Sequence, residues 1–290
     1  MKKNNQLKGT LYICGTPIGN LEDITLRALN VLKKVDLIAA EDTRHTKKLL
    51  SHYQINTPVT SYYEYNKFKK APYLIEKIRN GQKIALVSDA GMPGISDPGY
   101  FIVNLALKND IKVIPIPGVS AVITALVVSG LPSEHFIFEG FLPRKCTERK
   151  KYFGKIESEN RTLIFYETPH RLKKTLRDML KIWGDRRIVI ARELTKKYEE
   201  VLRGEISEIL KVLEDREIKG EITLIVEGNT RGEKYDESDL MKRDKIIEEF
   251  LKELILQKYS NKEIIKIAQE KLNISKNIIY KKLLEIKDSG

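Results

Sequence analysis

One stretch, residues 84–99, constrains the fold of this chain more than any other. It begins with a short apolar run, Ile84 to Val87, which is typical of a strand buried on both faces of a parallel sheet. A loop with three glycines and two prolines follows, and Asp89 places a carboxylate in it. Asp97 can then cap a helix, and Pro98 suits the first helical position because its missing N–H has no partner there. This order predicts an α/β sheet with a ligand crevice at the carboxyl edge of its strands, although a tight turn without a ligand also fits.

Two further turns between a strand and a helix carry glycine. The predicted strand over 10–14 leads into residues 15–20, which lack the dinucleotide fingerprint because their glycine spacing is wrong and a proline intervenes. The predicted strand over 113–116 leads into residues 117–121, where Ser120 can cap a helix and main-chain N–H groups stay available to a ligand. Three such turns in one α/β domain indicate a shared crevice.

Charged side chains follow three other predicted strands. These strands cover 37–40, 162–166 and 188–191, and the charged segments after them cover 41–45, 167–171 and 192–196. Charged side chains at the carboxyl end of a strand suggest a binding or catalytic site, because open α/β sheets bind ligands at that edge. The alternative for Asp42 is that it only caps the next helix, as Thr168 would before Pro169.

The last part of the chain, residues 242–290, predicts a separate helical module after a polar linker over 231–241. Residues 260–263 form a capping box, and Ser275 can cap another helix after a short turn. This pattern is typical of a helix-turn-helix, and residues 241–290 contain 12 basic and 8 acidic side chains. A helical cap that only packs against the protein is the alternative.

Composition narrows the function classes. The formal net charge of +12 favours a polyanionic partner such as nucleic acid, although a lysine-rich composition alone also produces such a value. The densest basic run, residues 144–155, has six basic residues and one acidic residue. No apolar run reaches membrane-spanning length, and the N-terminus lacks the apolar segment of a signal peptide. Cys14 and Cys146 make neither a disulfide framework nor a zinc site, so we expect a cytoplasmic protein without a metal.

Taken together, the motifs resemble the tetrapyrrole methylase superfamily of S-adenosylmethionine-dependent enzymes over nearly the full chain. Within it, the chain is most similar to the ribosomal RNA small subunit methyltransferase I family, whereas a corrin methylase resembles only the glycine loops. The family pattern usually has histidines where this chain has Tyr63 and Tyr65, so we assign no role to that loop. The matching motifs are residues 15–20, 40–44, 88–99, 117–121, 167–171 and 192–196.

The resemblance implies a two-domain α/β fold of the tetrapyrrole methylase type with a C-terminal helical module. We expect an N-terminal α/β domain over 1–131, a second α/β domain over 132–230, a linker over 231–241 and an RNA-binding module over 242–290. It also implies S-adenosylmethionine bound between the two α/β domains, and a homodimer. The implied reaction is methylation of a cytidine 2′-hydroxyl in the decoding region of 16S ribosomal RNA, as naked RNA or within the small ribosomal subunit.

The resemblance and the strand ends also supply candidate site residues. A base that takes the ribose hydroxyl proton would help the reaction, and basic side chains could hold flanking phosphates. The sequence does not rank the candidates. By position, the cofactor would touch Pro17, Ile18, Asp89, Gly91, Met92, Ser120, Ala121, Tyr166, Ala191 and Thr223. The candidate catalytic carboxylates are Glu41, Asp42, Glu167 and Glu193, and the candidate basic residues are Arg44, Arg171, Arg192 and Lys196.

Two other functions remain open on the sequence alone. One is a tetrapyrrole (corrin-type) small-molecule methylase, which leaves the helical tail, the basic run and the net charge unexplained. The other is a DNA-binding regulator with an α/β sensor domain, which leaves the charged strand ends in both domains unexplained.

Overall fold

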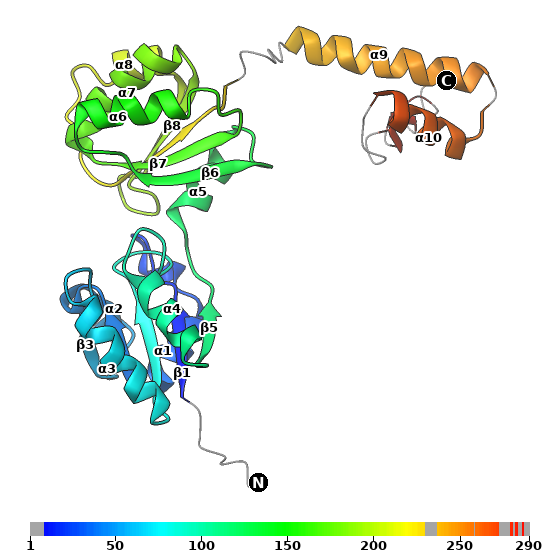
Figure 1. Ribbon diagram of the computed structural model, residues 1–290. Helices are drawn as coiled ribbons and strands as arrows, with labels where there is room; N and C mark the ends of the chain where they lie inside the picture. The colour runs from blue at the N-terminus through cyan, green and yellow to red at the C-terminus, as the bar shows by residue number, and fades with distance from the viewer. Residues whose placement is uncertain are drawn as a thin grey trace. The chain divides into compact units, whose positions relative to one another are not determined.

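The computed structural model describes residues 9–229, 237–257 and 259–272, together with positions 279, 280, 282, 283 and 286 (Figure 1). The chain divides into two compact units, one that ends at Asn229 and one that begins at Thr230. None of the helices in these described ranges has the length and apolar character needed to cross a bilayer.

The first sheet is parallel throughout, with the strand order β3-β2-β4-β1-β5. All the strands predicted for this part form in one α/β sheet. Strands β1, β2 and β4 are largely buried, whereas β5 lies at the sheet edge and buries only Ile116. The strands are β1 (Thr10–Cys14), β2 (Leu37–Ala40), β3 (Val59–Ser61), β4 (Lys83–Val87) and β5 (Lys112–Ile116). The intervening helices are α1 (Leu26–Lys34), α2 (Thr43–His52), α3 (Lys67–Arg79) and α4 (Gly99–Lys108), and a 3-10 turn covers Leu21–Asp23.

Helices cover both faces of this sheet. Leu74 and Ile78 of α3 and Ile102 of α4 pack on one face, against strand residues such as Leu11 and Ile84. A second apolar cluster on the other face brings α1 and α2 against β2, β4 and the end of β5. Because both faces are covered, the carboxyl edge of the sheet is where loops meet and a crevice can form.

The second sheet is mixed, with the order β6-β7-β10-β8-β9. Strands β6 and β7 are parallel, and the remaining pairs are antiparallel. Three helices pack on one face around the fully buried Trp183, whose indole N–H donates to the Phe153 carbonyl at 2.9 Å. The strands are β6 (Phe136–Phe141), β7 (Thr162–Glu167), β8 (Arg187–Arg192), β9 (Glu200–Glu205) and β10 (Ile222–Val226), and the helices are α6 (Cys146–Lys155), α7 (Pro169–Trp183) and α8 (Ile206–Val212).

Helix α5 (Ala121–Ser129) covers the other face of the second sheet (Figure 1). Its Val122 and Leu126 pack against Val189 of β8 and Ile225 of β10. The helix precedes the boundary expected at residue 131, yet its buried side chains belong to the core of the second sheet. Its sequence is apolar on every side, so the pattern does not reveal which sheet the helix covers.

The second unit contains α9 (Glu237–Leu256) and α10 (Asn261–Leu272). The predicted capping box is confirmed: the Ser260 N–H donates to the Glu263 carboxylate at 2.8 Å, and the Glu263 N–H donates to the Ser260 hydroxyl at 3.4 Å. Helix α9 begins inside the range 231–241 that we expected to be a linker. Ser275, which we expected to cap a further helix, lies outside the described residues.

Candidate functional site

A cavity of about 470 Å³ lies where the carboxyl ends of β2, β4 and β5 face the ends of β7 and β8 and the start of β10. Both sheets contribute to its walls, as the resemblance implied for the cofactor cleft. The lining residues are Ile18, Glu41, Ser88, Asp89, Ala90, Gly91, Met92, Ile95, Ser96, Asp97, Ser120, Ala121, Phe141, Tyr166, Glu167, Thr168, Pro169, Ala191, Leu194, Gly220, Glu221, Ile222 and Thr223.

The three glycine turns predicted to share a crevice do meet at this cavity. Thr16 and Gly91 exchange two main-chain hydrogen bonds, at 2.9 and 3.1 Å, and the Thr16 hydroxyl donates to the Ser88 carbonyl at 3.1 Å. A Cβ atom placed on Gly15 would lie 2.7 Å from the Cα atom of Gly118. The loops after β1, β4 and β5 are therefore in contact, and the two glycines permit their close approach.

Two backbone features in these loops suit a ligand. Gly91 has a φ of +78°, a conformation that side chains with a Cβ atom rarely adopt, and it lines the cavity. At the start of α5, the Ser120 side chain makes no capping hydrogen bond, contrary to our expectation. The first N–H groups of α5 thus lack both an intrahelical and a side-chain acceptor, and they favour an anionic group at this wall.

Three carboxylates, those of Glu41, Asp89 and Asp97, lie on the cavity wall formed by the loops of the first sheet. The Asp89 carboxylate accepts the Asp42 N–H at 2.8 Å, and the Asp89 N–H donates to the Glu41 carboxylate at 3.5 Å. The Asp97 carboxylate accepts the Gly94 and Gly99 N–H groups, both at 2.7 Å. Asp97 therefore ties its loop to the start of α4, which begins at Gly99 rather than at Pro98.

Burial changes the acidity of these groups. The pKa of Glu41 lies above its ordinary value because burial disfavours the charged form, and the nearby charges of Asp89 and Asp97 add to this. The pKa of Asp97 is also raised, again mainly by burial, although three main-chain N–H groups oppose the shift. Within the described residues, no group of three or more His, Cys, Asp or Glu side chains is arranged to hold a metal ion.

The opposite wall is built by the second sheet. The Tyr166 ring packs against Phe138 and Phe141, with ring centroids 4.9 and 5.3 Å apart. The pKa of Tyr166 is raised by its burial and by the charge of Glu221. At the bulge in β6, a Cβ atom on Gly140 would lie 3.4 Å from the Ser96 hydroxyl, so the loop after β4 touches the second sheet here.

The segment after β8 closes one side of the cavity. The Thr195 hydroxyl accepts the Asn20 N–H at 3.0 Å, which joins this segment to the loop after β1. Lys196 is held between two carboxylates, with its Nζ 2.8 Å from Glu193 and 3.0 Å from Glu221. Partial burial of Glu193 is outweighed by the hydrogen bonds from Lys196 and the Glu221 N–H, so the pKa of Glu193 is lowered.

The ten residues expected to touch the cofactor lie close together. Nine of them line the cavity: Ile18, Asp89, Gly91, Met92, Ser120, Ala121, Tyr166, Ala191 and Thr223. Pro17 is in the contacting loop but not in the lining. Of the eight candidate carboxylates and basic residues, only Glu41 and Glu167 are among the lining residues.

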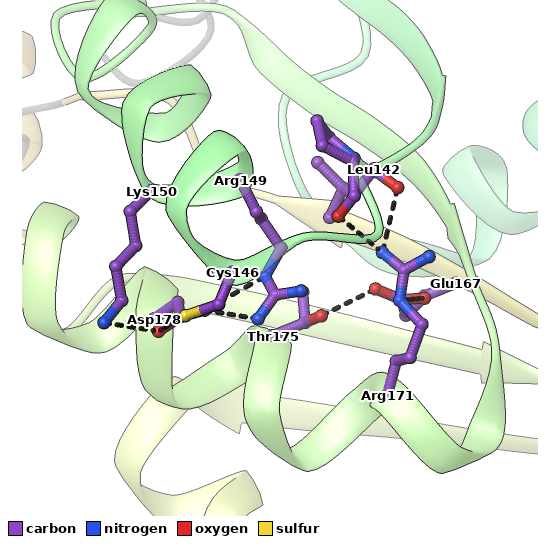
Figure 2. Close-up of polar contacts among 9 residues, drawn as sticks. Leu142, Cys146, Arg149, Lys150, Glu167, Arg171, Thr175 and Asp178 are labelled. Carbon is purple, nitrogen blue, oxygen red and sulfur yellow. Dashed lines mark hydrogen bonds and ion pairs between the residues drawn. The ribbon is translucent and has the colours of Figure 1, made fainter.

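Glu167 lines the cavity, but both oxygens of its carboxylate have hydrogen-bond or ion-pair partners within the protein. Figure 2 shows it between α7 and the β6–α6 connection, where Oε2 accepts the Thr175 hydroxyl at 2.6 Å. Its Oε1 accepts the Thr168 N–H at 2.7 Å. Arg171 Nε lies 3.2 Å from Oε1 as an ion pair, and its guanidinium donates to the Leu142 carbonyl at 2.9 Å. Glu167 and Arg171 thus anchor the second sheet to its helices.

The other candidates also have protein partners. The Asp42 carboxylate caps α2 by accepting the Arg44 N–H at 2.8 Å and pairs with the exposed Arg44 guanidinium at 2.9 Å. Arg44 holds the pKa of Asp42 at about 2. Arg192 pairs with Glu200 at 3.2 Å. Of the candidate bases, Glu41 alone is half-buried in the cavity, and its pKa is raised.

Sequence reasoning missed part of the lining. Gly220, Glu221 and Ile222 reach the cavity because β10 lies antiparallel between β7 and β8, so its first residues meet their last ones. Phe141 is the last residue of β6, and Leu194 lies in the charged segment 192–196 that follows β8. The reversed direction of β10 depends on its pairing with distant strands, since Ile222 lies opposite Arg192 of β8 and Glu167 of β7, and no local sequence pattern predicts this pairing. The missed residues are Ser88, Ala90, Ile95, Ser96, Asp97, Phe141, Thr168, Pro169, Leu194, Gly220, Glu221 and Ile222.

The chemistry of the cavity suits a ligand with both charges and an apolar part. Glu41, Asp89 and Asp97 favour a cationic group or a diol, and the start of α5 favours a carboxylate. Ile18, Met92 and other apolar residues line the remainder.

Comparison with known proteins agrees with this architecture. A profile of the tetrapyrrole (corrin/porphyrin) methylases matches residues 10–210. The ribosomal RNA small subunit methyltransferase I of Halalkalibacterium halodurans is 50% identical over 94% of each chain. Its counterpart in Bacillus subtilis is 47% identical over 94% of this chain and 93% of its own. The protein of the same name in Haemophilus influenzae is 46% identical over 94% and 96%.

Solved structures share the fold at low sequence identity. Uroporphyrin-III C-methyltransferase from Thermus thermophilus, in complex with S-adenosylhomocysteine, has a TM-score of 0.54 at 17% identity and covers 76% of this chain and 97% of its own. Diphthine synthase has a TM-score of 0.59 at 15% identity, with 76% and 90% covered. These likenesses establish the fold.

Proposed function

This chain belongs to the tetrapyrrole methylases and, within them, to the ribosomal RNA small subunit methyltransferase I family, and on that premise we propose its reaction. It is a methyltransferase that uses S-adenosylmethionine. The proposed reaction transfers the methyl group to the 2′-hydroxyl of a cytidine in the decoding region of 16S ribosomal RNA. The proposed site residues are those of the cavity, with the ten expected cofactor contacts and Glu41 as the base.

The cavity between the two sheets carries this proposal. S-adenosylmethionine combines a carboxylate, two cationic centres, a ribose diol and an adenine, and it supplies an electrophilic methyl group when bound. The start of α5 would receive the carboxylate, and the wall formed by Asp89 and Asp97 would receive cationic or diol groups. Apolar residues such as Met92 and Leu194 would hold the adenine and exclude water. The residues present therefore fit the group.

Glu41 is the best candidate for the general base. Glu41 lines the cavity, and its raised pKa strengthens it as a proton acceptor compared with an ordinary glutamate. Asp42 and Glu193 have lowered pKa values and are paired with Arg44 and Lys196. The walls would align the ribose hydroxyl, and alignment alone accounts for a large part of such rate enhancements.

RNA binding is proposed for two basic regions. Lys151 and Lys155 are exposed on α6 and Lys145 is exposed just before it, whereas Arg149 is buried in an ion pair with Asp178. The module over 242–290 has a core between α9 and α10, in which Leu251 packs with Ile264 and Ala268. Phosphate contacts from these regions would hold RNA in a sequence-independent manner, since the major groove of an RNA helix is too narrow to read.

We also propose a homodimer that acts in the cytoplasm on the small ribosomal subunit. The observation that favours self-association is the exposed apolar side of α5, where Val127 is 70% exposed and Ile123 and Val128 are also accessible. Apolar side chains clustered at a surface often mark an interface. Light scattering of the wild type and of Val127→Asp would show whether two copies associate through this side.

The deciding experiment is methyl transfer from labelled S-adenosylmethionine to unmodified small subunits and, in parallel, to naked 16S RNA. Nuclease digestion and mass spectrometry should identify 2′-O-methylcytidine. Methylation of a base, of another nucleotide or of neither substrate would reject the proposal. The tetrapyrrole alternative is tested in the same way with uroporphyrinogen as the acceptor. We expect no methyl transfer to it, because relatives at about 50% identity are named as ribosomal RNA methyltransferases.

A further inference from the structure

A group of exposed aromatic and basic side chains follows β3 and takes no part in the proposed chemical step. We define the aromatic surface as Tyr63, Tyr65, Phe68 and Lys69. Tyr65 is 94% exposed and Phe68 is 69% exposed, which is unusual for rings of this size. The Tyr63 and Tyr65 rings lie 6.4 Å apart, and the Phe68 ring contacts Phe101 of α4 at 5.0 Å.

Buried Tyr62 places this surface beside the cavity. Its N–H donates to the Ala40 carbonyl at 2.7 Å, one residue before Glu41. Its hydroxyl donates to the Pro98 carbonyl at 3.2 Å, one residue after Asp97. Since Glu41 and Asp97 both line the cavity, the segment that begins at Tyr63 emerges directly next to the cavity wall.

The turn that displays Tyr65 is held in one conformation. The Tyr63 N–H donates to the Asn66 side chain at 2.9 Å, and the Asn66 N–H donates to the Tyr63 carbonyl at 3.0 Å. The Asn66 amide also donates to the Ser61 hydroxyl at 3.3 Å. A ring that projects from a fixed turn loses little further freedom when a flat partner stacks on it.

The charge around the rings favours a polyanion. Residues 63–70 contain three lysines and one glutamate, and the Lys67 ammonium lies 5.2 Å from the centre of the Phe68 ring. Lys69 is exposed. Exposed rings among cations bind single-stranded nucleic acid, because bases stack on the rings and the cations meet phosphates. A second copy of this chain, whose net charge is +12, is a poorer match for this surface.

We infer that the aromatic surface stacks unpaired nucleotides next to the target nucleotide and so guides that nucleotide into the cavity. This inference rests on the proposed RNA substrate, and it adds a specificity for single-stranded RNA on one side of the site. Tyr65 and Phe68 would carry the stacking, and Lys69 would contact a phosphate.

The test measures binding of the full chain to a short fluorescent oligocytidylate and to an RNA duplex of the same length. The wild type should prefer the single strand. Tyr65→Ala and Phe68→Ala should each weaken single-strand binding about 5-fold or more, as base stacking on one ring predicts. Tyr65→Trp keeps an aromatic ring and should bind the single strand about as tightly as the wild type. Neither alanine variant should change the salt dependence, whereas Lys69→Ala should flatten it.

Tyr198→Ala is the matched control. Tyr198 is 66% exposed and has the Lys197 ammonium 5.6 Å from its ring, but it follows β8 rather than β3. It should bind the single strand like the wild type. Equal losses in Tyr198→Ala and Tyr65→Ala, or unchanged binding in both ring variants, would overturn the inference. So would a change in oligomeric state on Tyr65→Ala, because the surface would then be an interface between copies.

The result is separable from the proposed function. If the wild type methylates 16S RNA and both ring variants bind the single strand as well as the wild type does, only the role of the aromatic surface is rejected. A wild type that transfers no methyl group to RNA would reject the proposed function, and the binding comparison would still report directly on the rings.

Discussion

The carboxylate of Asp89 accepts a hydrogen bond from the main-chain N–H of Asp42, with 2.8 Å between the two atoms. This bond joins the loop after β4 to the loop after β2 and brings Glu41 next to Asp89. The nearby negative charge adds to the burial of Glu41, so its pKa is raised. The contact thus places the candidate base in the cavity and shifts its acidity.

Replacing Glu41 by glutamine should therefore separate function from stability. Glu41→Gln keeps an oxygen that accepts the Asp89 N–H but removes the charge. We expect kcat to fall about 10²-fold or more, as for loss of a general base, with a much smaller change in affinity for S-adenosylmethionine. The melting temperature should rise by roughly 1–3 °C, because a charge that burial disfavours is gone.

Asp42→Asn is the control for that variant. Asp42 is paired with exposed Arg44 outside the cavity lining, and asparagine still caps a helix. Its turnover should stay within about 3-fold of the wild type, since a surface ion pair contributes little. If Asp42→Asn impaired turnover and Glu41→Gln did not, the assignment of the base would be wrong.

Stability should depend on pH through the same group. A carboxyl group with a raised folded-state pKa binds more protons in the folded than in the unfolded protein between its ordinary and raised pKa values. The contribution of Glu41, and likewise of Asp97, therefore destabilises the protein as pH rises through that window. The urea midpoint of the wild type minus that of Glu41→Gln should decrease as the pH is raised from about 4, the ordinary pKa of glutamate. A flat difference would contradict the raised pKa.

Gly91 should be required for cofactor binding. Its φ of +78° disfavours any side chain, and a Cβ atom would point into the meeting place of Ile18 and the Val119 carbonyl at the cavity. Calorimetry on Gly91→Val should show no binding of S-adenosylmethionine. Gly154→Ala is the control, because nothing lies within 4 Å of a Cβ atom there. Wild-type affinity of Gly91→Val would place the cofactor elsewhere.

The basic run over 144–155 should divide into one structural residue and several RNA-binding residues. The Arg149 guanidinium is buried against Asp178 with Nε at 3.0 Å (Figure 2), so Arg149→Ala should lower the free energy of unfolding by about 3 kcal/mol or more. Exposed Lys151→Ala should change it by less than about 0.5 kcal/mol but weaken RNA binding. Urea unfolding and RNA titration measure both, and identical behaviour of the two variants would refute the division.

Removal of the second unit should weaken RNA binding without affecting the cofactor. A chain that ends at Asn229 lacks the whole of α9, because this helix begins at Glu237, so no helix is cut in the middle. Its affinity for RNA should fall, and the slope of affinity against salt should flatten by about 0.7 to 0.9 for each phosphate that the shortened chain no longer binds. An unchanged slope would indicate that the module packs or dimerises instead. Affinity for S-adenosylmethionine should be unchanged, since the cavity lies in the first unit.

Much of the architecture follows from local sequence. Strands such as β4 and β7, the glycine turn at Gly91 and the capping box at Ser260 depend on interactions among residues a few positions apart. Such interactions can be read from the order of residue types, because hydrophobic period, capping side chains and glycine conformation act within one or two turns of chain. The strand-end rule likewise predicts that the glycine loops share one crevice.

The chemistry of the individual side chains depended on the tertiary structure. Glu41, Glu167 and Glu193 all follow buried strands and look equivalent in sequence, yet Glu167 is held by Thr175, and Glu193 by Lys196 and the N–H of Glu221. The contact between Glu193 and the N–H of Glu221 forms because Glu221 directly precedes β10, which pairs antiparallel with β8 although the two strands are distant in the chain. Whether a carboxylate faces a cavity or a cation is decided by packing between distant segments, since burial and neighbouring charge set its pKa, and neither is encoded in the residues beside it.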